Sequence, residues 1–288
     1  MGTLPGHVMI GIFFLTYSLY RSVLLSLALL RGEKLLRFPQ PPREKQDQKW
    51  WQVVPLEGLM KVVCTVIPTL AEFYYPLGVN RLKMIDWEDP QRSFMFKDCW
   101  QHVTMYAFFM ISGVVDIVSR SWQMTKLKQA AEALSFYTLM LLMATHLENK
   151  STLEIRVHLL LMLPAFLMAL VLTVEIWVPD QPSLWVLRTW LQLIFSNWLL
   201  QIAVVIYAPP TGHPWQSDNP EDMAFLPIFF CWHLALGAGV LAIIYGLCSL
   251  WYHHSSSCRE VSCSRYQPCP TDASSSDELQ KLRAEAML

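Results

Sequence analysis

Long apolar runs, separated by short polar breaks, recur along the whole chain. A helix needs roughly 20 apolar residues to cross the hydrocarbon layer of a membrane. Runs of about that length cover 8–30, 53–75, 100–119, 127–147, 153–177, 183–207 and 223–252. They are too long for strands and lack the alternation of period two that a half-buried strand shows. The pattern therefore predicts an all-α, polytopic membrane bundle of seven transmembrane helices.

The composition supports the same class of protein. Hydrophobic residues make up 53% of the 288 positions and charged residues only 16%, with a mean hydropathy of +0.31. A chain this apolar does not fit inside one water-soluble core, so we expect a lipid bilayer around it. We divide it into a seven-helix transmembrane domain, 1–252, and a Ser- and Cys-containing cytosolic tail, 253–288, which we expect to be mostly disordered.

The second apolar run differs from the others because it carries charge. Glu57, Lys61 and Glu72 lie within it, together with Pro55 and Pro68. Charged groups and broken backbone hydrogen bonds are costly against lipid. We therefore expect neighbouring helices to shield this run from the lipid.

The distribution of basic residues predicts the orientation. Of the segments after the first, third, fifth and seventh runs, the first, second and last are rich in Lys and Arg, whereas the segments on the opposite side are comparatively acidic. Basic loops stay on the cytoplasmic side. We predict an amino terminus outside, a cytosolic carboxy terminus, and a location in the secretory pathway or the plasma membrane. Cys248 and Cys258 would then lie at the cytosolic end of the last run, where S-palmitoylation and unmodified thiols are equally compatible with the sequence.

Histidines gather at the outer side of the predicted membrane domain. In the predicted topology, five histidines from five helices lie in the same half of the membrane, with two carboxylates nearby: His7, His102, His146, His158 and His233, with Glu72 and Glu154. Imidazole and carboxylate groups are ligands for zinc, copper or iron. The sharper hypothesis is a metal site; the alternative is a set of interfacial residues or interhelical hydrogen bonds.

The inner half of the membrane carries a second polar group. Asp116 shares a helix face with His102, but the two lie about 21 Å apart at 1.5 Å per residue. An ionised carboxylate in lipid needs a partner, and the available residues at this depth are Arg21, Glu57, Lys61 and Arg188. A structural ion pair, a neutral Asp116 and a proton relay all remain open.

Amide side chains mark the sixth run. Asn197 and Gln201 are four residues apart and so lie on the same helix face. Amides in membrane helices commonly form hydrogen bonds to neighbouring helices. We expect these two to hold the bundle together.

Several sequence blocks resemble one family of membrane proteins. They are "GHVMIGIFF" from residue 6, "PLEG" at 55–58, "WQHVTMYAFFMISGVVDI" at 100–117, "ATHLENKSTLEIRVHLLL" at 144–161, "SNWLLQIAVVIYAPP" at 196–210 and "FFCWHLA" at 229–235. In this order they resemble the transmembrane protein 45 family, also called domain of unknown function 716. The loop containing "KMIDW" and the Ser-rich tail favour the transmembrane epididymal protein branch.

The resemblance implies a topology and a membrane location but no assigned activity. It also implies histidine at all five positions above, whereas Ala144 stands where relatives often have a further histidine, which weakens the metal hypothesis. Three function classes follow. One is a metal-dependent intramembrane hydrolase or oxidoreductase, in which His102, His158 and His233 bind the metal and Glu72 or Glu154 acts as ligand or base.

The other two classes are a nonenzymatic trafficking or scaffolding protein, with structural histidines, and a transporter. The ligand would be a lipid or another small molecule, and protein partners stay unspecified. Nothing in the sequence suggests binding to nucleic acid. The nucleotide-binding, zincin and lipase-type motifs do not occur.

Overall fold

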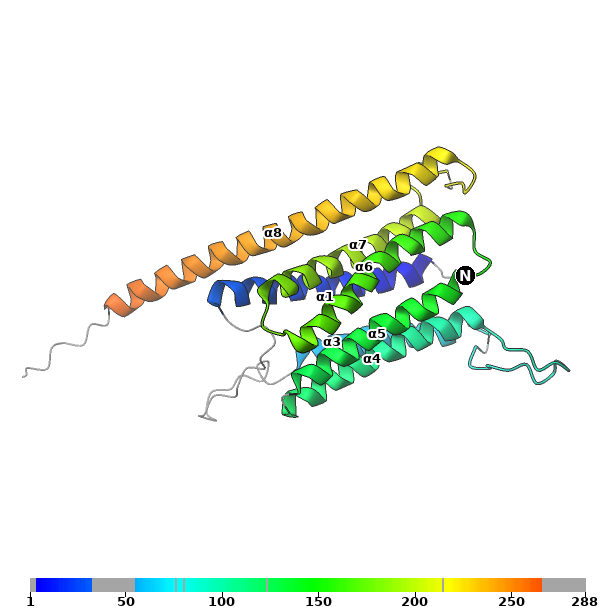
Figure 1. Cartoon of the computed structure of the whole chain (residues 1–288), viewed down its shortest axis with the longest axis horizontal. Helices are drawn as coiled ribbons and strands as arrows, with labels where there is room; N and C mark the ends of the chain where they lie inside the picture. Colours follow the sequence, from blue (N-terminus) through cyan, green and yellow to red (C-terminus); the bar gives the residue numbers. More distant parts are fainter. Residues whose placement is uncertain are drawn as a thin grey trace, which may run out of the picture. The chain divides into compact units, whose positions relative to one another are not determined.

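The computed structural model describes residues 4–32, 55–75, 77–79, 81–122, 124–213 and 215–265, with side chains up to residue 254 except those of 120–122 (Figure 1). Over these residues the chain forms seven helices and one isolated β-bridge, between Ile85 and Phe94. The helices are α1 (Leu4–Arg31), α3 (Leu56–Tyr74), α4 (Lys97–Trp122), α5 (Thr125–His146), α6 (Thr152–Trp177), α7 (Pro182–Tyr207) and α8 (Pro220–Arg265).

The prediction of an all-helical membrane protein is confirmed. Each predicted run forms a helix, and five helices are long and apolar enough to cross a membrane: Leu4–Arg31, Lys97–Ser119, Thr152–Trp177, Pro182–Tyr207 and Pro220–His254. The chain is thus a multi-pass membrane protein. Helix α8 continues beyond the predicted end of its run at residue 252, and the rest of the tail, 266–288, lies outside the described residues.

Helix α3 is not covered on all sides, so the expectation of a fully shielded second run is wrong. Its polar and small residues face inward, and large apolar residues on the other side are exposed: Leu56, Leu59, Val63, Ile67 and Leu70. The buried positions are Gly58, Lys61, Thr65 and Pro68. The helix thus satisfies both environments by separating its charges and its apolar surface onto opposite faces.

Six of the helices form a closed ring. Helix α1 contacts α3 and α7, and the other neighbours along the chain, α3 to α4, α4 to α5, α5 to α6 and α6 to α7, pack against each other. The interior holds large apolar side chains with almost no exposure, among them Phe136, Leu172, Ile194 and Trp198. Close packing of this kind holds membrane helices together where lipid is as apolar as the side chains.

The chain divides into two compact units, residues 1–246 and 247–288. In the first unit, the beginning of α8 packs on α7: the Trp190 Nε1 donates to the carbonyl of Leu234 at 3.0 Å, and Gly237 lies against Ile194. The ring and the sites described below belong to this unit.

Polar turns and loops join the described helices outside the apolar segments. Ser151 begins α6 with a capping box, in which its hydroxyl accepts from the Glu154 amide and the Glu154 carboxylate accepts from the Ser151 amide. In the loop before α4, the Ser93 hydroxyl donates to Asp89 at 2.6 Å, which lowers the pKa of the exposed Asp89 carboxyl. The capping box thus fixes where α6 starts, and the Ser93–Asp89 bond orders the loop before α4.

Candidate functional site: a histidine cavity and a buried ion network

The ring places polar side chains in two separate groups. The direction of the chain alternates between successive ring helices, so the start of one helix lies beside the end of the next. The starts of α1, α4 and α6 and the ends of α3 and α5 carry the histidine group, which is joined by Glu72. The other ends of these helices, with the start of α7, carry the ion network.

Four of the five predicted histidines line one cavity of about 80 Å³. They are His7, His102, His146 and His158, and Glu72 is in the same wall. The ring centroids of His102 and His146 lie 4.9 Å apart, and those of His158 lie 6.0 Å from both His146 and His7. Five helices thus contribute imidazole or carboxylate to a single cavity.

Hydrogen bonds orient three of these rings. His102 Nδ1 lies 2.7 Å from Glu72 Oε1, and His146 Nδ1 lies 3.1 Å from the amide oxygen of Gln101. His158 Nδ1 lies 2.7 Å from the backbone carbonyl of Glu154 and so donates to it. A histidine held through Nδ1 has Nε2 left as the nitrogen for a second partner, which is how metal-binding and proton-carrying histidines are commonly arranged.

His233 and the Glu154 carboxylate do not line the histidine cavity. His233 on α8 has its Nε2 3.4 Å from the Gln201 amide oxygen, and its ring packs against Trp198. Glu154 uses its carboxylate in the capping box with Ser151. The position of a residue along the chain does not say which face of its helix turns toward the ring interior, so the sequence could not separate these two residues from those that line the cavity.

The metal hypothesis has a specific geometric requirement. Among the described residues, no three His, Cys, Asp or Glu side chains converge closely enough to hold an ion in the positions they occupy. Zinc takes nitrogen ligands at roughly 2.0–2.1 Å, so three ligand atoms have to converge on one point. A metal bound here would require at least one imidazole to change rotamer.

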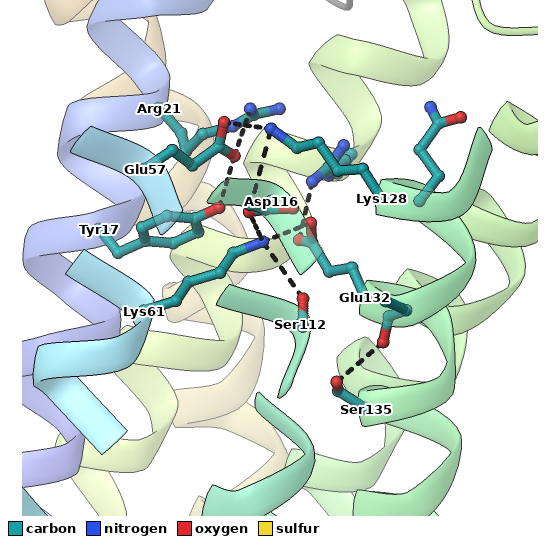
Figure 2. A network of polar contacts seen from close by, with 12 residues as sticks. Tyr17, Arg21, Glu57, Lys61, Ser112, Asp116, Lys128, Glu132 and Ser135 are labelled. Atoms are coloured by element: carbon teal, nitrogen blue, oxygen red, sulfur yellow. Dashed lines mark hydrogen bonds and ion pairs between the residues drawn. The ribbon is translucent and has the colours of Figure 1, made fainter. Parts of the chain in front are cut away.

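The ion network centres on Lys61 (Figure 2). Its ammonium donates to Asp116 at 2.7 Å and to Glu132 at 2.8 Å, with Ser112 at 3.5 Å. Of the residues that the sequence offered as partners for Asp116, the structure places Lys61 within hydrogen-bond distance. All three charged groups are buried, and burial is tolerable because each charge faces an opposite one.

Glu57 is the second junction of the network. Its Oε1 accepts from the Tyr17 hydroxyl at 2.7 Å and from Arg21 at 2.8 Å, and its Oε2 accepts from Lys128 at 2.5 Å. The Lys128 ammonium also lies 4.0 Å from Asp116, which joins this junction to the first. Figure 2 shows how α1, α3, α4 and α5 all converge here.

Arg188 forms the third junction. Its guanidinium donates to Glu132 at 2.7 Å and to Glu175 at 3.0 Å, and both carboxylates are buried. The complete network pairs four cations, Arg21, Lys61, Lys128 and Arg188, with four carboxylates, Glu57, Asp116, Glu132 and Glu175. The two sets of charges balance.

Lys128, Glu132 and Glu175 were not among the residues predicted from the sequence. A signal for them was present. Lys128 and Glu132 are four residues apart, so they lie on the same helix face, and Glu175 sits in an otherwise apolar run at the same end as Arg188. Counting all charges at that depth and requiring neutrality would have pointed to these residues.

The remaining predicted residues have smaller roles in the described part of the chain. Gln201 reaches α8 through His233, and Asn197 is half-buried one turn earlier on α7. Cys248 is half-buried on α8, and the side chain of Cys258 lies outside the described residues. Lipidation of either cysteine stays a prediction.

Comparison with known proteins assigns the family. A model described as "Family of unknown function (DUF716)" matches residues 125–246. Transmembrane epididymal protein 1 of Rattus norvegicus is 36% identical over 260 residues, which is 88% of this chain and 83% of the relative, and transmembrane epididymal protein 1A of Mus musculus is 36% identical over 88% and 83%. Transmembrane epididymal protein 1 of Homo sapiens is 33% identical over 78% of this chain and 82% of its own length. These matches confirm the resemblance seen in the sequence, and the chain belongs to the transmembrane epididymal protein family.

Proposed function

We propose that this membrane protein binds a small polar ligand or a transition-metal ion in the cavity lined by the four histidines and Glu72. The observation that carries the proposal is the convergence of His7, His102, His146, His158 and Glu72 from five helices on one cavity of about 80 Å³. Scattered interfacial histidines would not be expected to share one cavity. Polar groups that converge in a cavity inside an apolar bundle are the usual form of a ligand site.

The proposal includes seven membrane crossings. Helices α3 and α5 carry too many charges to be apolar throughout, but Glu57, Lys61, Lys128 and Glu132 face the ion network, and Glu72 lines the histidine cavity. Their outer faces are apolar and exposed along the helix length, with Leu59 and Leu70 on α3 and Leu134 and Leu141 on α5. Such faces suit lipid. We propose an outer amino terminus and a cytosolic carboxy terminus, in the secretory pathway or the plasma membrane, as the basic segments indicate.

The enzyme hypothesis needs a revised ligand set. The contacts favour His102, His146 and His158 over the predicted set with His233, because His233 contacts Gln201 and Trp198 outside the cavity. Glu72 is the carboxylate within reach of an imidazole and would serve as ligand or base. A scaffolding role in which the histidines are purely structural is the alternative. It predicts that the cavity binds nothing.

The test is the metal content and visible absorption spectrum of the detergent-purified protein. A His102→Ala, His158→Ala variant is compared with a control, His213→Ala, whose side chain is exposed in the loop before α8. Stoichiometric zinc, copper or iron that is lost only in the double variant would establish a metal site.

The polar-ligand form of the proposal is tested on the same proteins. If no metal copurifies, a thermal-shift screen with small polar solutes, including anions that can accept hydrogen bonds from imidazole, distinguishes a polar-ligand site from a scaffold that binds nothing. Stabilisation of the wild type that the double variant lacks supports a polar ligand. Equal behaviour of all three proteins in both assays contradicts the proposal and favours the scaffold.

A further inference from the structure

A second cavity lies next to the histidine cavity inside the ring. It has a volume of about 50 Å³ and is lined by Tyr17, Lys61, Glu132 and Gln192, together with apolar residues. It therefore opens onto the ion network. A cavity needs roughly 10–15 Å³ to hold one water molecule, so both cavities have room for a few.

The two cavities share part of their walls. Ile10, Phe14, Tyr106 and Phe109 line both of them. Side chains of α1 and α4 therefore belong to both walls and lie between the histidine group and the ion network. The ring centroids of His102 and Tyr106, one turn apart on α4, lie 6.3 Å from each other, so the tyrosine continues the polar wall toward the second cavity.

Four phenylalanines form the partition. Phe14 lies 5.5 Å from Phe109 and 5.0 Å from Phe195, while Phe136 lies 5.1 Å from Phe109 and 6.1 Å from Phe195, measured between ring centroids. The contacts close a cycle of edge-to-face rings contributed by α1, α4, α5 and α7. Apolar constrictions of this kind stop conduction in channels by excluding water.

The second cavity also contains a buried acceptor without a protein donor. Gln192 is 2% exposed, and its side-chain oxygen has no hydrogen-bond partner in the described part of the chain. Buried polar atoms in native proteins are nearly always satisfied, by water where protein donors are lacking. Gln192 therefore offers a small hydrogen-bonding species an acceptor in the wall of this cavity.

We propose that the two cavities form a gated pathway for protons across the bundle, with the four phenylalanines as the gate. This inference rests on the proposed function only in sharing the histidine cavity with it. A proton is the species that passes with the least rearrangement, since a single file of water molecules is enough to carry it. Anything larger would have to displace the phenylalanine cycle.

Titratable groups extend on both sides of the gate. On the histidine side, His102 contacts both Glu72 and His146, and the Glu72 side chain is 21% exposed. His146 in turn contacts Asp98 and His158. Glu72 is the point of entry from that end.

On the other side, Tyr17 and Lys61 lead from the second cavity to Glu57 and Lys128, which are the more exposed members of the network at 15% and 12%. Glu132 and Asp116 lie between them as partners of Lys61. A proton taken up at one end is released at the other, only bonds to hydrogen change, and the electrochemical gradient supplies the driving force.

The experiment measures proton flux in phosphatidylcholine vesicles that contain the full chain and an entrapped pH-sensitive dye. A potassium gradient with valinomycin drives the protons. We expect Phe109→Ala to raise the flux at least tenfold above the wild type, because it opens the cycle. Phe166→Ala, on the exposed face of α6, is the matched control and should behave as the wild type. Adding Glu72→Gln or His102→Gln to Phe109→Ala should return the flux to the wild-type level.

The outcomes distinguish proton conduction through the histidine cavity from a nonspecific leak. A folded Phe109→Ala protein that conducts no faster than protein-free vesicles overturns the proposal. An increased flux that survives both Glu72→Gln and His102→Gln overturns it as well, because the protons then bypass the histidine cavity. If the alanine variant fails to fold, Phe109→Leu replaces it, because leucine keeps an apolar side chain at this position. We expect a flux between those of the wild type and of an open gate. A flux equal to that of protein-free vesicles counts against the pathway.

Metal binding is measured on the same preparations. Bound metal without flux contradicts only the pathway, whereas flux without any bound ligand contradicts only the ligand site. The two proposals can therefore fail separately.

Discussion

Gly58 of α3 and Gly113 of α4 meet backbone to backbone. A Cβ atom on Gly58 would lie 2.7 Å from the Gly113 carbonyl oxygen, and one on Gly113 would lie 2.9 Å from the Gly58 carbonyl oxygen. Side chains do not fit between the two helices at this point. The same crossing brings Lys61, one turn after Gly58, against Asp116, one turn after Gly113. Close approach of the glycines is thus what allows the short ion pair.

The first prediction concerns this crossing. Gly113→Ala should lower the free energy of unfolding in detergent by about 1–3 kcal/mol, since overpacking forces backbone shifts. The matched control is Gly239→Ala on α8, where an added Cβ meets nothing within 4 Å. Because alanine is the better helix former, the control should be neutral or slightly more stable. Unfolding in mixed dodecyl maltoside and sodium dodecyl sulfate measures both variants, and equal effects would show that the crossing has room to spare.

The second prediction concerns Lys61. Lys61→Met leaves Asp116 and part of Glu132 without their nearest cation, and removing one partner of a buried ion pair costs about 3–5 kcal/mol. The control is Lys97→Met, which breaks a pair with Glu148 of the same length, 2.8 Å, but with both side chains at least half exposed. An exposed pair contributes about 0–1 kcal/mol. The same detergent unfolding assay compares the two.

A double variant sharpens the second prediction. Lys61→Met with Asp116→Asn removes a charge of each sign and should recover part of the lost stability. If the double variant is as unstable as the sum of its parts, Lys61 and Asp116 do not stabilise each other as their distance implies.

The helices were predictable because their cause is local. A run of about 20 apolar residues gives a membrane helix whatever its neighbours are, so each predicted run is a helix in the structure. The error on α3 has the same origin. Its charges were read as a reason for shielding all round, whereas Glu57 and Lys61 are turned toward the ring interior and Leu59 toward the outside.

The sites were only partly predictable because they depend on which face of each helix turns inward. The positions of the histidines along the predicted helices placed all five in the same half of the membrane domain, and four of them do line one cavity. His233 is not one of them, because α8 packs on α7 and brings His233 against Gln201. The partition of four phenylalanines left no signal in the sequence, because its members come from four helices with ordinary apolar patterns.

The third prediction separates His233 from the cavity histidines. If the histidine cavity binds zinc, His102→Ala should weaken binding at least tenfold, whereas His233→Ala should leave the affinity within about twofold, since loss of a ligand or its orienting partner typically costs 10–100-fold. Equilibrium dialysis of the purified variants measures the affinity. A loss in His233→Ala as large as that in His102→Ala would restore the ligand set inferred from the sequence.

The last prediction tests whether α5 crosses the membrane. The turn between α5 and α6 contains the exposed Asn149, and the turn before α5 contains the exposed Met124. We expect Asn149→Cys, in a background without reactive cysteines, to be labelled on intact cells by a membrane-impermeant maleimide. Met124→Cys should react only after the membrane is permeabilised, because 22 residues of α5 separate the two turns, a rise of about 33 Å at 1.5 Å per residue. Labelling of both positions from the same side would mean that α5 does not span the bilayer. Glu132 and Lys128 would then face water rather than the ring interior, and neither the closed ring nor the proton pathway would survive that result.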